Sequence, residues 1–507
     1  MKKDGKNLTQ KAAFTLLNSA VQHSATLIVG FFITPLIVSG LGKELFGVWG
    51  IIRQSLSYLL LGDTFVSGIL KFTIAREQHN NDDSIKQRLT TTALIQLVII
   101  SPFLLLGGIF AAYWAPDILH VSPANSLHVR NAFLFTAISV PLLCLSNVPG
   151  SILRGMNQDY RAMGVTAGSI LFIGLLNIYA VKMGYGLKGL VIVNTVGAVL
   201  AGIIRFVVLV KVVDWFALRK PVKSDFISFL RLGGWSFASS LGAILLNASD
   251  VIMVGILWGP SKAAIYTMTG FVIRFMQEPL NQMISSVAPG LTGMYGKADT
   301  EGVAKIHVEL QSLVIFVLTV VCVPIAIFNE VFIKLWVGHD YFGGNLLNLI
   351  LIATLLVKQL IRIDSLIALA ALDFKNTTLL LFISGVISIT CTYLLSLYCD
   401  MPVSMAGFLI GQCSLLILYR RYMKLYINRQ PIVTNDTLKG IIFLIIMFIV
   451  AIFIPPLMVN TLIVGWKSFF IIVLIAGTLT AIMTWVFGLS RNTRKVLSSR
   501  IRQIIKC

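Results

Sequence analysis

The chain has 507 residues, of which 57% are apolar and only 12% charged, and its formal net charge is +20. This composition excludes an ordinary soluble domain, in which about 25% of the residues are charged. The net positive charge does not indicate nucleic-acid binding. The Lys and Arg residues stand in short segments beside apolar runs, where anionic lipid attracts them. We therefore expect membrane lipids, and no nucleic acid, as partners.

Apolar runs of about 20 residues recur along the whole chain, and each is long enough to cross a hydrocarbon core of about 30 Å. Lipid offers no hydrogen-bond partner to an open backbone, so these runs must be helices. The sequence predicts an all-α polytopic membrane protein with about fourteen transmembrane helices. The predicted spans are 14–40, 45–70, 91–113, 130–152, 163–182, 188–210, 233–256, 263–287, 310–328, 346–370, 377–398, 402–424, 439–457 and 468–490.

The Lys and Arg residues are concentrated in alternate connections between these spans. Clusters occur before residue 12, between 71 and 88, between 211 and 231, between 420 and 429, and after residue 490. Positively charged connections stay on the cytoplasmic side of a membrane. Both termini are therefore predicted to be cytoplasmic, the second within a basic tail.

Motifs for catalysis or for cofactor binding are absent from the sequence. It contains no GxxxxGK[ST] phosphate loop, no HExxH and no Cys/His zinc spacing, and its six cysteines are scattered. We expect no cofactor, no metal and no enzymatic activity.

A short internal repeat relates the two halves of the chain. Setting Gly42 on Gly259 puts Trp49 on Tyr266, and an arginine follows in both halves, Arg53 in the first and Arg274 in the second. The repeat predicts two six-helix lobes around a central cavity with two further helices at the end. We place the lobes at residues 1–215 and 216–430, and the last two helices with the basic tail at 431–507.

Four cations lie inside predicted spans: Arg53, Arg274, Lys358 and Arg362. A charge at the bilayer centre costs about 2.5–3.5 kcal/mol, so it usually marks a site or a pathway. Lys358 and Arg362 are four residues apart and so share one helix face. Two pairings would instead make some of these cations structural, since Glu278 follows Arg274 by four residues and Asp364 lies beside Arg362.

Three stretches carry a resemblance to a known family: LGKELFGVW at 41–49, RGMNQDYRA at 154–162, and NASDVIMVGILWGPSKAAIYTM at 247–268. The chain resembles the polysaccharide flippases of the MOP (multidrug, oligosaccharidyl-lipid, polysaccharide) exporter superfamily, and the Wzx-type O-antigen flippases in particular. The resemblance implies a MATE-like fold in the bacterial inner membrane. It also implies that alternating access carries an undecaprenyl-pyrophosphate-linked oligosaccharide from the cytoplasmic to the outer leaflet.

The same resemblance suggests roles for the charged residues and for other proteins. The four cations would bind the anionic phosphate of the substrate. The acids Asp63, Asp250 and Glu278 would either carry a coupling ion or serve as structural counter-charges. A polysaccharide polymerase and a chain-length regulator are the expected protein partners.

Two other functions are compatible with some of these sequence features, namely the many apolar spans and the charged residues inside them. A cation-coupled multidrug exporter would share the fold, but it would need an acidic cavity and usually has twelve helices. A membrane glycan polymerase or ligase would need a large outward loop with catalytic residues, and the outward connections are short. A flippase is therefore the function that the sequence favours.

Overall fold

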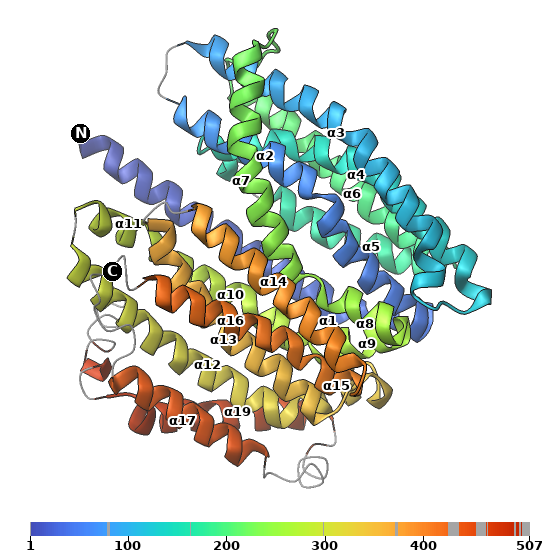
Figure 1. Cartoon of the computed structure of the whole chain (residues 1–507), viewed down its shortest axis with the longest axis vertical. Helices are drawn as coiled ribbons and strands as arrows, with labels where there is room; N and C mark the ends of the chain where they lie inside the picture. Colours follow the sequence, from blue (N-terminus) through green and yellow to red (C-terminus); the bar gives the residue numbers. More distant parts are fainter. Residues whose placement is uncertain are drawn as a thin grey trace. The chain divides into compact units, whose positions relative to one another are not determined.

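The computed structural model describes residues 2–78, 82–162, 164–297, 299–370, 374–423, 435–452, 463, 465–490, 493–495 and 498. Every regular element in these ranges is a helix, which confirms the all-α prediction (Figure 1). The chain divides into two compact units. The N-terminal unit comprises Met1–Ile244 and Val251–Ala264, and the C-terminal unit comprises Leu245–Asp250 and Ile265–Cys507. The lobe boundaries proposed from the internal repeat stay predictions.

The N-terminal unit consists mainly of long helices. Its elements are α1 (Lys2–Leu59), α2 (Leu61–Arg76), α3 (Asp83–Ile118), α4 (Pro123–Gly155), η1 (Asp159–Ala162), α5 (Val165–Lys182), α6 (Gly186–Val212), most of α7 (Lys223–Asn247), and most of α8 (Asp250–Trp258) with the start of α9 (Pro260–Thr269). Within α1, two helical segments meet at Gly42, whose φ of 75° and ψ of 171° only glycine adopts readily. The connection predicted between the first two spans therefore lies at Gly42.

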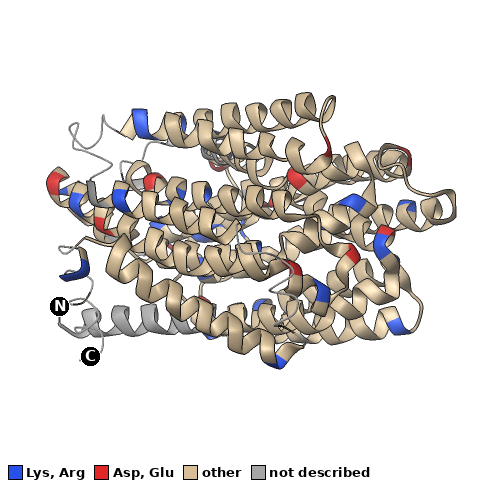
Figure 2. Cartoon of the chain, turned by 90° about the horizontal axis from the view of Figure 1, so that it is seen from below, with Lys and Arg blue, Asp and Glu red and all other residues tan. Residues whose placement is uncertain are grey.

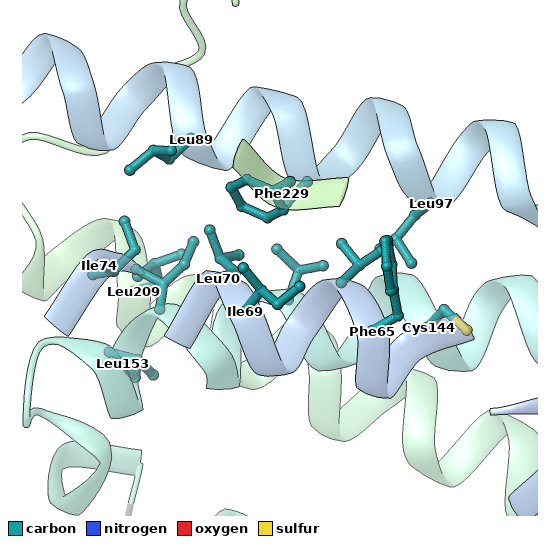
Figure 3. Close-up of a cluster of buried hydrophobic side chains, with 14 of the residues drawn as sticks. Phe65, Ile69, Leu70, Ile74, Leu89, Leu97, Cys144, Leu153, Leu209 and Phe229 are labelled. Carbon is teal, nitrogen blue, oxygen red and sulfur yellow. The ribbon is translucent and has the colours of Figure 1, made fainter. Parts of the chain in front are cut away.

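The core of this unit surrounds α2. Val66, Leu70 and Ile74 are fully buried and stand four residues apart, so they form one face of the helix. They pack with side chains of α3, α4, α6 and α7, among them Leu97, Cys144, Leu209 and Phe229 (Figure 3). Because lipid is as apolar as these side chains, close van der Waals packing rather than burial from water stabilises such a contact.

The C-terminal unit contains α10 (Phe271–Ser285), α11 (Ala288–Gly296), α12 (Thr300–Trp336), η2 (His339–Tyr341), α13 (Asn345–Ala370), α14 (Phe374–Ser396), α15 (Met401–Ser404), α16 (Ala406–Met423), α17 (Asn435–Ile452), α19 (Trp466–Met483) and η3 (Thr484–Gly488). α13 lies at its centre and packs against α10, α11, α12 and α16. The last two helices, α17 and α19, both pack against α12.

Ten helices in the described residues are long and apolar enough to cross a membrane, or eleven if the pair Phe237–Asn247 and Asp250–Trp258, bent by 52°, is one span. Three departures from the predicted spans explain the difference from fourteen. The first two predicted spans are joined at Gly42 and count as one span, Val21–Asp63, and the second predicted span continues into α2. The span 263–287 is divided between α9 and α10, which have 10 and 15 residues. The span 439–457 extends beyond the described residues, which stop at Ile452.

Lys, Arg, Asp and Glu residues are sparse along the helices (Figure 2). The helices in Figure 2 have long stretches without a Lys, Arg, Asp or Glu. This distribution is what a multi-pass membrane protein requires, because the hydrocarbon core excludes unpaired charges.

Glycines let α14 and α16 approach each other closely. Gly407 and Gly411 are four residues apart on α16 and face Thr392 and Ser388 of α14. A Cβ atom at Gly407 would overlap the backbone nitrogen of Thr392, and one at Gly411 would lie 2.8 Å from the Cα atom of Ser388. Small residues at this spacing are typical of close helix contacts in membranes.

We expect Gly407→Ala to destabilise the C-terminal unit by about 1–3 kcal/mol, because the added methyl group forces the backbones of α14 and α16 apart. Thermal unfolding of the purified protein in detergent measures this loss. Gly477→Ala on α19 is the matched control, since a methyl group there meets no atom within 4 Å. Equal melting temperatures for the two variants would contradict the close contact.

Candidate anion-binding site

A pocket within the C-terminal unit brings together charged residues from three helices. It encloses about 510 Å³ of empty space, including its open side, and has apolar walls from the end of α7, α10, α13, α16 and Met405, which follows α15. Such a pocket, with a few converging polar groups, is the usual form of a small-molecule site. Its polar lining residues are Asp250, Tyr266, Arg274, Gln277, Thr354 and Lys358.

Asp250 is the only carboxylate that lines this pocket in the described part of the chain. It begins α8, directly after the bend that separates α8 from α7. Its Oδ2 atom accepts a hydrogen bond of 2.8 Å from the Tyr266 hydroxyl and one of 3.3 Å from Arg274 Nη2. The Arg274 guanidinium also lies over the Tyr266 ring, 4.9 Å from the ring centroid. These three residues therefore form one connected polar group.

Lys358 enters the same pocket from α13. Among the described residues its ammonium group has no hydrogen bond and no ion pair within 4 Å. One carboxylate thus faces two cations, and the pocket has a surplus of one positive charge. A partly buried ammonium in apolar surroundings is costly unless an opposite charge compensates it, so the pocket is suited to an anion.

The structure brings two of the four predicted cations together, Arg274 and Lys358. Arg362, one turn along α13 from Lys358, is exposed and donates a hydrogen bond of 2.8 Å to the Ser285 hydroxyl, and it does not line the pocket. Arg53 is exposed and lies in the N-terminal unit, on the second segment of α1.

Both alternative pairings suggested by sequence proximity are wrong. Arg274 pairs with Asp250, 24 residues earlier, whereas Glu278 is exposed and accepts a hydrogen bond of 3.4 Å from the Asn281 amide. Asp364 is fully buried and contacts other helices rather than Arg362. Tertiary contacts determine both pairings, because burial removes these groups from solvent and makes a close partner necessary.

Asp63 lies in the N-terminal unit, in the first turn of α2, and contacts α4. Its carboxylate accepts hydrogen bonds from the Ser67 hydroxyl, at 2.5 Å, and from the Asn147 amide, at 2.8 Å. The bond to Asn147 connects two neighbouring helices through one partly buried acid, so the geometry favours a structural contact.

Two lining residues were not identified from the sequence, Gln277 and Thr354. Gln277 is three residues after Arg274, and Thr354 is four residues before Lys358. Residues at these spacings share a helix face. A search for polar neighbours one turn from each intramembrane cation would therefore have found both.

The sequence model of a family described as polysaccharide biosynthesis protein matches residues 15–294, which is more than half of the chain. The chain belongs to this family. It is 23% identical to the Bacillus subtilis "Uncharacterized membrane protein EpsK" over 62% of this chain and 63% of that protein. It is 24% identical to a Shigella flexneri protein named "Putative O-antigen transporter" over 66% of this chain and 81% of that protein.

Two solved structures show which fold this chain has. The lipid II flippase MurJ in an inward closed conformation superposes with a TM-score of 0.67, at 16% identity, over 92% of this chain and 97% of that one. An inward-facing multidrug resistance MATE transporter of the MOP superfamily superposes with a TM-score of 0.61, at 15% identity. The superposition covers 82% of this chain and 98% of that one. The MATE-like fold and the membership of a polysaccharide biosynthesis family, both predicted from the sequence, are confirmed.

Proposed function

We propose that this protein is a flippase for a lipid-linked oligosaccharide. Its substrate is an undecaprenyl-pyrophosphate-linked O-antigen repeat unit or a similar surface polysaccharide unit. The protein moves this substrate from the cytoplasmic to the outer leaflet of the bacterial inner membrane by alternating access, with both termini in the cytoplasm. Membership of the polysaccharide biosynthesis family and the name of the Shigella relative support transport of a saccharide.

The observation that carries this proposal is the unbalanced charge of the pocket. A pyrophosphate linkage is a compact anion, and the pocket offers it the Lys358 ammonium and those Arg274 donors that Asp250 does not accept. Arginine binds phosphate through a planar fork of donors, while lysine acts as a point charge. The two side chains together therefore match a phosphate group better than either cation alone.

The polar residues around the cations are suited to the first sugar of the substrate. Gln277 and Thr354 provide an amide and a hydroxyl next to the charged groups. The Tyr266 ring is unsuited to stacking on a sugar, because Arg274 covers one of its faces and the side chain is only 2% exposed. Arg53 and Arg362 stay predictions as further substrate-binding cations.

The proposed activity is transport without covalent chemistry. Because the flippase delivers the repeat unit to the outer leaflet, a polysaccharide polymerase and a chain-length regulator would act on its product as partners. A multidrug exporter for organic cations is disfavoured, since the surplus positive charge of the pocket repels such compounds.

We expect the purified protein in liposomes to translocate a fluorescent undecaprenyl-pyrophosphate oligosaccharide at least tenfold faster than liposomes without protein. Quenching of the outer-leaflet probe measures the rate. The same liposomes should not accumulate ethidium, and the oligosaccharide should keep its length. Ethidium transport without oligosaccharide transport would favour the drug exporter, and chain elongation would favour a polymerase.

A further inference from the structure

Two arginines lie close together near one end of the N-terminal unit. Arg154 is in the last turn of α4 and Arg205 is in the second half of α6, and α6 packs against both α4 and α5 (Figure 1). Both side chains approach Gly150: a Cβ atom at this glycine would lie 3.5 Å from Arg205 Cδ and 3.6 Å from Arg154 Nη1. The two guanidinium groups are therefore close enough to repel each other.

Small residues fix the backbone positions from which the two arginines extend. Gly202 is three residues before Arg205, and a Cβ atom there would lie 2.8 Å from the Cα atom of Ser146 on α4. Ser146 is itself one helical turn before Gly150. The two helices are thus in direct contact one turn from the arginines, as small residues allow in membranes. Only side-chain rotation can move the two charges apart.

Hydroxyl groups hold the two guanidinium groups in place. Arg205 Nη2 donates a hydrogen bond of 2.6 Å to the Thr166 hydroxyl in the first turn of α5. Arg154 Nη2 donates one of 3.2 Å to the Ser151 hydroxyl. A guanidinium group has five N–H donors, and the described residues accept from only one in each arginine. Most donors of both side chains are therefore available to a ligand.

The charge of the two arginines is poorly compensated. In the described residues neither arginine forms an ion pair within 4 Å, although Asp63 attracts Arg154 and Asp159 attracts Arg205 from farther away. Arg205 is partly buried and stands seven residues before the end of α6, about 10 Å along the helix. A cation at such a depth is costly unless an anion compensates it. An anion between the two guanidinium groups would also remove their repulsion.

The surroundings of the arginines indicate which kind of anion reaches them. Ile204 and Phe206, the neighbours of Arg205 on α6, are exposed apolar side chains, and so is Leu145 on α4. Lys and Arg residues are concentrated between 211 and 231, directly after α6, in a connection predicted to be cytoplasmic. A soluble anion would have to leave water for this apolar surface. A lipid places its phosphate group there while its chains lie along the helices.

We propose that Arg154, Arg205 and the Thr166 hydroxyl bind the phosphate group of a membrane lipid. The planar donor fork of arginine matches phosphate oxygens. Basic sites between transmembrane helices on the cytoplasmic side are suited to anionic headgroups. Two lipids of the bacterial membrane carry this chemistry, an anionic phospholipid and a polyprenyl phosphate. The site shares no residue with the pocket of the C-terminal unit and does not depend on the proposed function.

Thermal unfolding of the full-length protein, purified in detergent without phospholipid, tests this site. The probes are phosphatidylglycerol, phosphatidylcholine, undecaprenyl phosphate and inorganic phosphate. We expect phosphatidylglycerol to raise the wild-type melting temperature more than zwitterionic phosphatidylcholine does, because a ligand of the folded state stabilises it. The dissociation constant obtained from this shift should rise about tenfold in Arg154→Gln and in Arg205→Gln, since each variant loses a charged donor.

Arg219→Gln is the matched control for nonspecific attraction of anionic lipid. Arg219 is exposed in the connection after α6, and its side chain forms no hydrogen bond or ion pair with the described residues. This variant should bind phosphatidylglycerol with wild-type affinity. Without lipid, Arg154→Gln and Arg205→Gln should melt at or above the wild-type temperature, because each removes one of two repelling charges. If Arg205→Gln does not fold, the exposed Arg154→Gln decides alone.

The remaining outcomes identify the lipid or overturn the site. Weaker binding of undecaprenyl phosphate alone in the two variants would support the site and identify its lipid as the polyprenyl carrier. Unchanged affinity of both variants for both anionic lipids would overturn it. Equal stabilisation by millimolar inorganic phosphate would contradict a lipid ligand. Failure of the protein to flip oligosaccharide would contradict the proposed function and would leave this site unaffected.

Discussion

We expect Lys358→Gln to lower the rate of oligosaccharide flipping at least tenfold. Glutamine keeps most of the length and polarity of the side chain but removes the charge that no acid within 4 Å balances in the described residues. A hydrogen bond to a charged group contributes about 1.5–3 kcal/mol, and every 1.4 kcal/mol changes an affinity by about tenfold. The liposome assay measures the rate, and surface glycan in a flippase-deficient strain provides an independent readout.

Three further variants make this result specific. Lys334→Gln removes the same charge at an exposed position near the end of α12 and should flip at the wild-type rate. Lys358→Arg keeps the charge and should retain part of the activity. Arg362→Gln shows whether the anion site continues one turn along α13. Wild-type flipping by Lys358→Gln at equal expression would rule out the pocket as the phosphate site.

The second large effect concerns the pair formed by Asp250 and Arg274. We expect Asp250→Asn and Arg274→Gln each to lower stability by about 1–3 kcal/mol, because each leaves a charge without its partner in a poorly solvated pocket. The double variant should lose less than the sum of the two, since neither charge then remains. The difference is a coupling energy of about 0.5–3 kcal/mol. Thermal unfolding of all four proteins in detergent measures it.

Asp117→Asn is the matched control for this cycle. Asp117 is exposed near the end of α3, and its carboxylate forms no hydrogen bond or ion pair with the described residues. Its replacement should leave the melting temperature unchanged. Strictly additive effects of Asp250→Asn and Arg274→Gln would show that the two side chains do not interact in solution.

The prediction of a multi-pass helical membrane protein needed only local information. Runs of about 20 apolar residues can satisfy their backbones in lipid only as helices, so the sequence alone shows that many membrane-crossing helices follow one another. Breaks within the helices were harder to predict. Gly270 separates α9 from α10 although the predicted span 263–287 is apolar on both sides of it, because composition says little about where a helix bends.

The candidate site likewise combines features that the sequence reveals with contacts that only the structure shows. The sequence identified Arg274 and Lys358 as unusual, because a cation within an apolar run is costly wherever the helix lies. Their meeting in one pocket depends on the packing of α10 against α13, two helices that the whole of α11 and α12 separates along the chain. In the sequence Tyr266 stood out only as the counterpart of Trp49 in the internal repeat, and its hydrogen bond to Asp250 required coordinates.

The sequence by itself determined the membrane environment, the helical class, the polysaccharide biosynthesis family and the positions of the intramembrane charges. These properties follow from the composition of single segments and from short motifs. Only the tertiary structure decided which charges are paired: Arg274 with Asp250, and Asp364 with His307 and Arg420. The physical reason is that the strength of an ion pair depends on distance and on local dielectric, and both are set by helices that are far apart in the chain.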